Sequence, residues 1–355
     1  MKKIDKNSKN LVKLAAINPY LEDNIVKPTE KFIQGQKFVG WGDSNQYPTY
    51  LYNLYNDVSI LHSIVNGIVE YVGGDGVNVI SPYLTEFEAF KLINEITFQY
   101  VMYGGIAINV LRNKAKQVVK LIPLDWEYIR MPQDKDSKIV YYSEDFGQKS
   151  SGRCKAIEYP LFDPEKKDES SIFIFNPSRK TVYPVPTYAA SILAIETEKK
   201  ITEFHYNSIV NGFSSNVIIS FCNGIPDDEQ QEEISNNIDE KFTGSENAGR
   251  PIINFCNDTE HSVQVDRIDT DSFADRYEAL SKRTQQDIFT AFRAFPVLFG
   301  IYQEGTGFND QDYQEAYKLF NRTTIKPIQN LVKQLIEHLL EQTTIEIKPF
   351  TINFD

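Results

Sequence analysis

The chain has 355 residues, of which 41% are hydrophobic, and a formal net charge of -12. This length can bury one elaborate core or two ordinary ones. The acidity argues against a strong, sequence-independent DNA binder, which gains affinity from a basic face and counterion release; alternatively, the acidity only keeps the protein soluble.

The chain begins with a basic arm. Lysines occupy positions 2, 3, 6, 9 and 13, and no continuous apolar stretch follows them. A signal peptide is therefore not expected. The arm is interpreted as a disordered tail, with a DNA contact as the alternative. No segment reaches the ~20 apolar residues needed to span a bilayer, so no membrane association is expected.

Residues 1–185 predict an α+β arrangement. An apolar stripe after Pro48 predicts a helix, and residues 84–103 predict another helix that Gly104 and Gly105 stop. Runs rich in β-branched and aromatic residues predict mainly antiparallel strands around residues 106–111, 118–122, 129, 139–142, 156–159 and 171–175.

Two long amphipathic helices of nearly equal length are predicted at residues 186–212 and 270–295. The first starts with a proline in its first turn, and the second starts at Ser272 and stops at Pro296. Each would be roughly 35 Å long at a rise of about 1.5 Å per residue. Helices this long and this far apart in sequence suit a repeated wall. The alternative is two core helices of an ordinary α+β protein.

Residues 213–269 form a small acidic insert between the two helices. Strands are predicted at 216–221, 251–256 and 262–265, and a helix with an acidic face starts at Pro226. A segment of this size is small for an independent core, so it would be steadier packed against copies of itself.

Residues 296–308 are predicted to form a loop. Asn309 can cap a helix over residues 309–341, which Pro327 should kink or restart. Residues 342–355 contain an alternating segment that can add a strand to an earlier sheet.

Three cysteines, Cys154, Cys222 and Cys256, are an odd number without paired spacing. This favours a reducing cytoplasm over a secreted disulfide fold. Cys222 and Cys256 both end predicted strands and could be neighbours; the alternative is that both are small buried hydrophobic residues.

Three segments carry a resemblance to a known family. Residues 286–300, QDIFTAFRAFPVLFG, end a long helix in a proline–aliphatic–glycine turn, and residues 320–331, FNRTTIKPIQNL, continue the helix that follows. Residues 41–48, WGDSNQYP, precede a helix that ends in a glycine-rich turn. This order of elements is similar to the portal proteins, or head–tail connectors, of tailed bacteriophages and prophages.

The resemblance implies an α+β, portal-like fold, whose parts can be assigned by their order. These are a mixed α/β wing at residues 1–185, stem helices at 186–212 and 270–295, a small α/β clip at 213–269, a channel-facing loop at 296–308, a kinked wing or crown-side helix at 309–341 and a strand returning to the wing at 342–355. A crown would be short or missing.

The resemblance also implies a ring, typically of about twelve copies of the chain, at one vertex of the phage head. Double-stranded DNA would pass through the channel without sequence recognition during packaging and ejection. The partners would be the large terminase, head-completion or tail adaptor proteins, and the major capsid or scaffold protein. The ring would belong to the virion after assembly in the host bacterial cytoplasm.

Particular residues follow from this assignment. The channel loop would be Tyr302, Gln303, Glu304, Gly305, Thr306, Gly307 and Phe308. Residues that line the channel or pair with neighbouring subunits would be Lys199, Lys200, Lys282 and Arg283. Clip residues that meet the motor or adaptor would be Asp227, Asp228, Glu229, Glu232, Glu233, Asp239 and Glu240. For each charged residue the alternative is a solvated helix face.

Sequence patterns of catalysis are missing. The sequence has four isolated histidines, His62, His205, His261 and His338. Neither a metal nor any other cofactor is therefore expected. Neither GxxxxGK[ST] nor GxGxxG occurs, and residues 73–76 are interpreted as a turn, with a phosphate cradle as the alternative. The chain is not expected to be an enzyme. The competing hypothesis is a soluble α+β enzyme with a small-molecule pocket around Trp126, Tyr128 and Tyr141.

Overall fold

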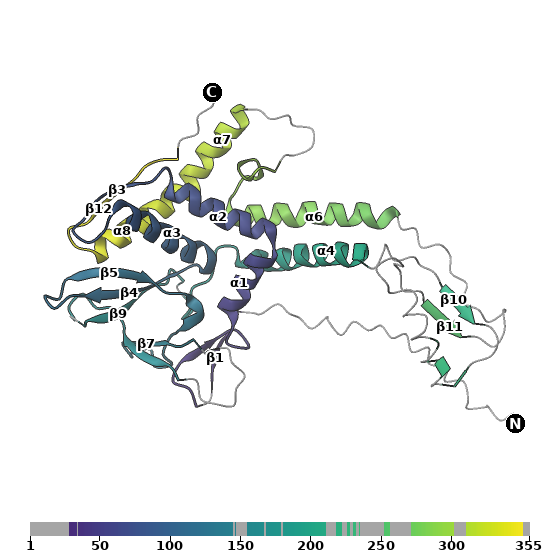
Figure 1. Ribbon diagram of the computed structural model, residues 1–355, viewed down its shortest axis with the longest axis horizontal. Helices are drawn as coiled ribbons and strands as arrows, with labels where there is room; N and C mark the ends of the chain where they lie inside the picture. The colour runs from purple at the N-terminus through teal and green to yellow at the C-terminus, as the bar shows by residue number, and fades with distance from the viewer. Residues whose placement is uncertain are drawn as a thin grey trace.

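The fold is α+β, with a helix-rich body from which a pair of long helices projects (Figure 1). The computed structural model describes residues 28–33, 35–144, 146, 155–166, 168–178, 180–210, 218–221, 226–227, 230–231, 234, 252–255, 271–301 and 310–350.

Three helices form the centre of the N-terminal half. They are α1 (Tyr47–Asp57), α2 (Ser59–Gly73) and α3 (Glu86–Tyr103). The helix predicted from the apolar stripe at residues 58–68 is α2, and α1 precedes it as a separate helix, because the extended backbone of Val58 (φ −112°, ψ 104°) interrupts the helix there. α3 starts at a capping box formed by Thr85 and Glu88. It ends at Gly104, which is left-handed (φ 79°).

The strands predicted in the N-terminal half are confirmed, and they form small antiparallel sheets. The strands are β1 (Glu30–Phe32), β2 (Val39–Trp41), β3 (Val77–Ile80), β4 (Ile106–Arg112), β5 (Val118–Pro123), β6 (Ile129–Arg130), β7 (Ile139–Tyr142), β8 (Ile157–Pro160) and β9 (Ser170–Phe175). The strand orders are β5-β4-β9, β6-β7-β8 and β1-β2. The sequence analysis does not predict β1, β2 or β3, which are three or four residues long.

The C-terminal part is a broken helix followed by a strand. Its elements are α7 (Asp310–Phe320), a π-helical turn (Asn321–Ile325), α8 (Lys326–Leu339) and β12 (Thr344–Ile347). The amide of Lys326 bonds to the carbonyl of Asn321, the wide step of a π turn. Pro327 lies in the first turn of α8, where its missing amide hydrogen is tolerated. The predicted restart at Pro327 is therefore observed, and β12 pairs antiparallel with β3.

The long helices are α4 (Ile192–Val210) and α6 (Asp271–Phe292), and Figure 1 shows them side by side. The first begins at Ile192 rather than at the predicted Pro186, after a 3₁₀ turn at Ala189–Ser191. The buried side chain of Tyr188 accounts for this late start. Its ring stacks on Phe292, and its hydroxyl donates to the carbonyl of Met102 at 2.8 Å.

α6 ends at Phe292, before the predicted residue 295. Arg293 is left-handed (φ 52°). Its amide donates to the carbonyl of Thr290, and the amide of Ala294 donates to the carbonyl of Phe289, both at 3.0 Å. These paired bonds close the helix as a Schellman motif does, so Pro296 instead begins a 3₁₀ turn (Pro296–Phe299).

The described part of the insert includes a pair of parallel strands, β10 (Ile218–Phe221) and β11 (Ile252–Phe255), and helical residues at 230, 231 and 234. Both agree with the predicted strands, and they lie beyond the far ends of α4 and α6 (Figure 1). The predicted strand at 262–265 and all three cysteines lie outside the described residues.

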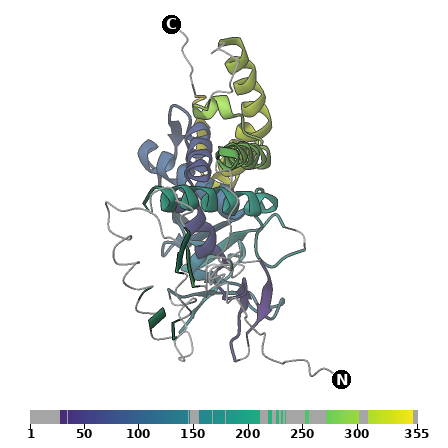
Figure 2. The ribbon, with the colours of Figure 1, turned by 90° about the vertical axis from the view of Figure 1, so that its right-hand side faces the viewer.

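One continuous hydrophobic core joins the body to the helix pair. Trp41 stacks on Tyr183 with ring centroids 4.5 Å apart and meets Trp126 edge-on at 5.5 Å. The same core includes Ile195 of α4 and Ile288 of α6, both fully buried. The helix pair is thus anchored at its base. Figure 2, which looks nearly along α6, shows α7 at one end of the body and the β1–β2 hairpin at the other.

Candidate subunit interface and channel surface

The contacts between α4 and α6 follow an antiparallel order. Near the body, the Ser191 hydroxyl donates to the carbonyl of Asp287 at 3.3 Å. Farther out, Phe204 stacks on Tyr277 with ring centroids 4.7 Å apart. The base of the pair is held by the apolar core, so the region between these two contacts needs its own stabilisation.

A carboxylate supplies that stabilisation at the middle of the pair. Glu198 of α4 accepts hydrogen bonds from the Ser281 hydroxyl at 3.1 Å and from the Thr284 hydroxyl at 2.7 Å. The side-chain amide of Gln285 donates a further bond at 3.0 Å. A partly buried carboxylate is tolerated when several donors satisfy it. Because all these donors lie on α6, Glu198 sets the register between the two helices.

Glu198→Ala is expected to loosen the helix pair. The substitution removes the acceptor of hydroxyl and amide donors on α6, of which Thr284 is only 5% exposed. We expect a loss of about 1–2 kcal/mol in unfolding free energy, because Ser281 and Thr284 keep alternative partners. Chemical denaturation measures this loss. Glu203→Ala is the matched control on α4 and should cost less than about 0.5 kcal/mol. Equal losses in the two variants would contradict the role assigned to Glu198.

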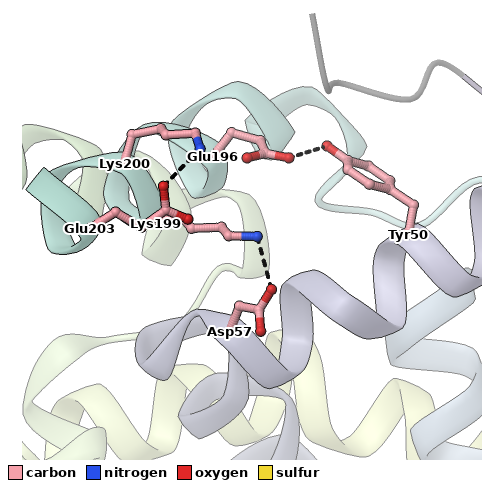
Figure 3. A network of polar contacts seen from close by, with 6 residues as sticks. All are labelled: Tyr50, Asp57, Glu196, Lys199, Lys200 and Glu203. Atoms are coloured by element: carbon pink, nitrogen blue, oxygen red, sulfur yellow. Dashed lines mark hydrogen bonds and ion pairs between the residues drawn. The ribbon is translucent and has the colours of Figure 1, made fainter. Parts of the chain in front are cut away.

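Two polar contacts tie α4 to α1 (Figure 3). The Tyr50 hydroxyl donates to the buried Glu196 carboxylate at 2.8 Å, and the Lys199 ammonium pairs with Asp57 at 2.8 Å. Burial, together with the bond to Glu196, raises the pKa of Tyr50. The bond to Asp57 raises the pKa of Lys199 against the opposing effect of burial. Both contacts direct polar groups of α4 toward the body of the same chain.

The four charged residues predicted on the stem have different surroundings. Lys199 is engaged with α1, and Lys200 pairs with Glu203 on its own helix at 2.7 Å. Lys282 pairs with Glu278 on its own helix at 2.8 Å. Arg283 is exposed and lines a groove between α4 and α6. Three of the four side chains are thus paired within the chain, and Arg283 lines the groove.

The groove between α4 and α6 has a volume of about 610 Å³. Most of its lining side chains are small, and two leucines stand exposed in it: Leu193 at 65% and Leu280 at 40%. The other lining residues are Thr187, Ala190, Ser191, Ala194, Thr197, Arg283, Thr284, Asp287, Thr290 and Ala291. Small side chains allow close approach of another helix, and exposed leucines gain free energy when they are covered. The groove is therefore a candidate subunit interface.

Most other predicted contact residues lie outside the described residues. Asp227 is described, and its carboxylate and carbonyl accept bonds from the amides of Gln230 and Gln231 at 2.9 Å. This is the contact of a helix cap. Outside the described residues are Asp228, Glu229, Glu232, Glu233, Asp239 and Glu240, and the predicted channel loop from Tyr302 to Phe308.

The three aromatic residues considered for an enzyme pocket have separate environments. Trp126 is fully buried, and its indole N–H donates to the carbonyl of Gly105 at 3.0 Å. Tyr141 packs in a small cluster with Phe38. Tyr128 lines a depression of about 210 Å³. The structure therefore does not bring the three side chains together around one pocket.

The described residues contain neither a metal-binding cluster nor a membrane-spanning helix. These residues include no group of three or more His, Cys, Asp or Glu side chains placed to hold a metal ion. His62 stacks on Tyr55 with ring centroids 4.4 Å apart. No helix of the described segments combines the length and apolar character needed to cross a bilayer.

Comparison with known proteins identifies the family. The sequence model of the phage portal protein family matches residues 82–354, more than half of the chain. The chain belongs to the phage portal protein family. This family is structural rather than enzymatic.

A probable portal protein is also found among individual relatives. The probable portal protein of Haemophilus phage HP1 (strain HP1c1) is 25% identical over 280 residues, which cover 78% of this chain and 74% of that protein. An uncharacterized protein of Rickettsia bellii (strain RML369-C) is 27% identical over 175 residues, which cover 49% of this chain and 43% of that protein.

Solved structures show the portal fold. The neck of an empty GTA (gene transfer agent) particle matches with a TM-score of 0.54 at 15% identity, over 85% of this chain and 84% of that chain. An HK97 family phage portal protein from Corynebacterium diphtheriae matches with a TM-score of 0.50 at 10% identity, over 84% and 94%. At these identities the likeness concerns the fold alone.

Sequence reasoning did not single out the residues that organise the helix pair. Glu198 lies in a charged run of α4, where it resembles a solvated residue. A signal was present on α6, since Ser281, Thr284 and Gln285 place polar groups on one side at three- and four-residue steps. Leu193 carries no comparable signal, because an apolar residue in a helix is ordinarily assigned to the core.

Proposed function

We propose that this portal protein forms a homo-oligomeric ring at one vertex of a phage head and conducts double-stranded DNA during packaging and ejection. The observation that carries the proposal is the helix pair α4/α6, which is anchored in the core at one end and has an unfilled groove along one side. Placed side by side, such pairs can line a common channel. A particle neck of similar fold was computed with C12 symmetry, which supports a ring of about twelve copies.

The parts of the chain receive roles by the same proposal. The body would be the wing, α4 and α6 the stem, and the insert with β10 and β11 the clip. Residues 302–308 would face the channel. The large terminase and the head-completion or tail adaptor proteins would dock at the acidic clip, and the major capsid or scaffold protein would contact the wing. The ring would be a virion component assembled in the bacterial cytoplasm.

The test is the size and shape of the purified full-length protein. Mass photometry and negative-stain imaging are expected to show rings of about a dozen subunits with a central hole. The α+β enzyme alternative instead predicts a stable monomer. A monomer at all concentrations, in which α4 and α6 are buried inside a single globule, would overturn the proposal.

A further inference from the structure

α6 carries charged pairs on two different sides. Arg283 and Asp287 line the groove between α4 and α6. Glu278 and Lys282 are exposed and do not line the groove; they pair with each other at 2.8 Å. At 3.6 residues per turn, a step of five residues separates the two sides by about 140° around the helix axis. One side can therefore meet a neighbour on the left while the other meets a neighbour on the right.

The order of charge on the two sides is complementary. Along α6 the groove side reads positive at Arg283 and negative at Asp287, while the other side reads negative at Glu278 and positive at Lys282. Both pairs have the same spacing of four residues. If two copies of α6 run in the same direction and are shifted by five residues, Arg283 meets Glu278 and Asp287 meets Lys282. The shift is about 7.5 Å along the helix.

The complementarity depends on the direction of the two helices. If the copies ran in opposite directions, as in a two-fold dimer, matching Arg283 with Glu278 would place Asp287 opposite Ala274. By symmetry the Arg283–Glu278 contact would also occur twice, so the groove side and the Glu278 side, about 140° apart on α6, would both have to face the same partner helix. A rotational ring requires the same direction in every copy and uses two different patches on each subunit. The charge pattern therefore matches a ring and not a two-fold dimer.

We propose that the α4/α6 groove of each subunit receives the Glu278–Lys282 side of α6 from the next copy in the ring. The leucines Leu193 and Leu280, exposed in the groove, add an apolar contact to the two ion pairs. This inference rests on the proposed ring and names the surfaces that close it. The charges also disfavour shifts of one and nine residues, because Arg283 would then meet Lys282 and Asp287 would then meet Glu278, respectively.

A charge-swap cycle tests the proposed contact. Arg283→Glu and Glu278→Arg each place like charges together across the interface. Each is expected to lower the ring-to-monomer ratio at least tenfold at equal subunit concentration in low salt. The double variant restores the opposite charges and is expected to recover at least half of the wild-type ring fraction. Lys91→Glu is the matched control, because Lys91 is exposed and pairs with Glu95 on α3 in the body.

Cysteine crosslinking gives an independent measurement of the five-residue shift. A chain with both Glu278→Cys and Arg283→Cys is expected to form covalent multimers in oxidised rings, seen as a ladder on a denaturing gel. The two single variants measure the background from the native cysteines. The pair Glu278→Cys with Asp287→Cys, a nine-residue shift, is the mismatched control and should give no ladder above that background.

The possible failures are distinguishable. If both charge-reversal variants formed rings as well as the wild type, and the five-residue cysteine pair gave no ladder, the proposed contact would be wrong. The proposed ring would still stand. The absence of rings in the wild-type protein would overturn the proposed function, and the contact with it. A double variant no better than the weaker single variant would also reject the contact. Far-UV circular dichroism and melting of each variant confirm that its subunits are folded.

Discussion

Gly104→Ala is expected to destabilise the protein by about 3 kcal/mol or more, the largest stability effect of any substitution considered for this chain. Gly104 ends α3 in the left-handed conformation, with φ 79° and ψ 5°. A Cβ atom there would lie 2.3 Å from the carbonyl oxygen of Val185 and 2.7 Å from the nitrogen of Pro186. Backbone atoms must therefore move. That backbone leads into α4, so the helix pair should shift with it.

Gly300→Ala is the matched control for backbone conformation. Gly300 has nearly the same geometry, with φ 76° and ψ 12°, and among the described residues, apart from its two chain neighbours, no atom lies within 4 Å of its added Cβ. Gly300→Ala should therefore lower the free energy of unfolding by only about 1 kcal/mol, which is the cost of placing an alanine in the left-handed conformation. Denaturant unfolding of both variants measures the difference. Similar losses would show that the contact with Val185 is unimportant.

Leu193→Asp is expected to prevent ring assembly while leaving the subunit folded. Leu193 is 65% exposed and lines the groove, so its replacement removes little packing within the chain. It is the second residue of α4, where the helix dipole favours a carboxylate. At the proposed interface, however, the substitution removes about 2 kcal/mol of apolar burial and buries a charge. The loss recurs at every contact of the ring, so mass photometry should find monomers.

Phe87→Asp provides the control for Leu193→Asp. Phe87 is the second residue of α3, is 76% exposed and does not line the groove. The variant therefore makes the same kind of change at the same helix position, away from the proposed contact. Rings are expected to form as in the wild type. If both variants assembled equally well, or equally poorly, the groove would have no special role in assembly.

Local sequence patterns predicted most of the fold. Two kinds of pattern act over only a few residues and need no distant partner. They are the apolar spacing and capping residues of α3 and the β-branched runs of β4, β5 and β9. The ends of the long helices were less predictable. Tyr188 delays the start of α4 through its contact with Met102, and a Schellman motif at Arg293 closes α6 before its proline.

The candidate interface was predictable only in part. The sequence showed two long helices with charged surfaces, and Arg283 was among the residues expected to meet a neighbour. It did not show that Lys199 would be held by Asp57 of α1. The partners of a charged side chain on a long helix depend on which element packs beside it, and that element is far away in the chain.

The sequence by itself determined the order of elements and the family, because helix and strand periodicity and turn residues are local properties. Only the tertiary structure decided which side chains of the long helices find partners within the subunit and which stay exposed. Glu198 is engaged and Leu193 is left exposed, although both lie on the same helix. Burial and hydrogen bonding are set by neighbours in space, so the groove became visible only when α4 and α6 were placed side by side.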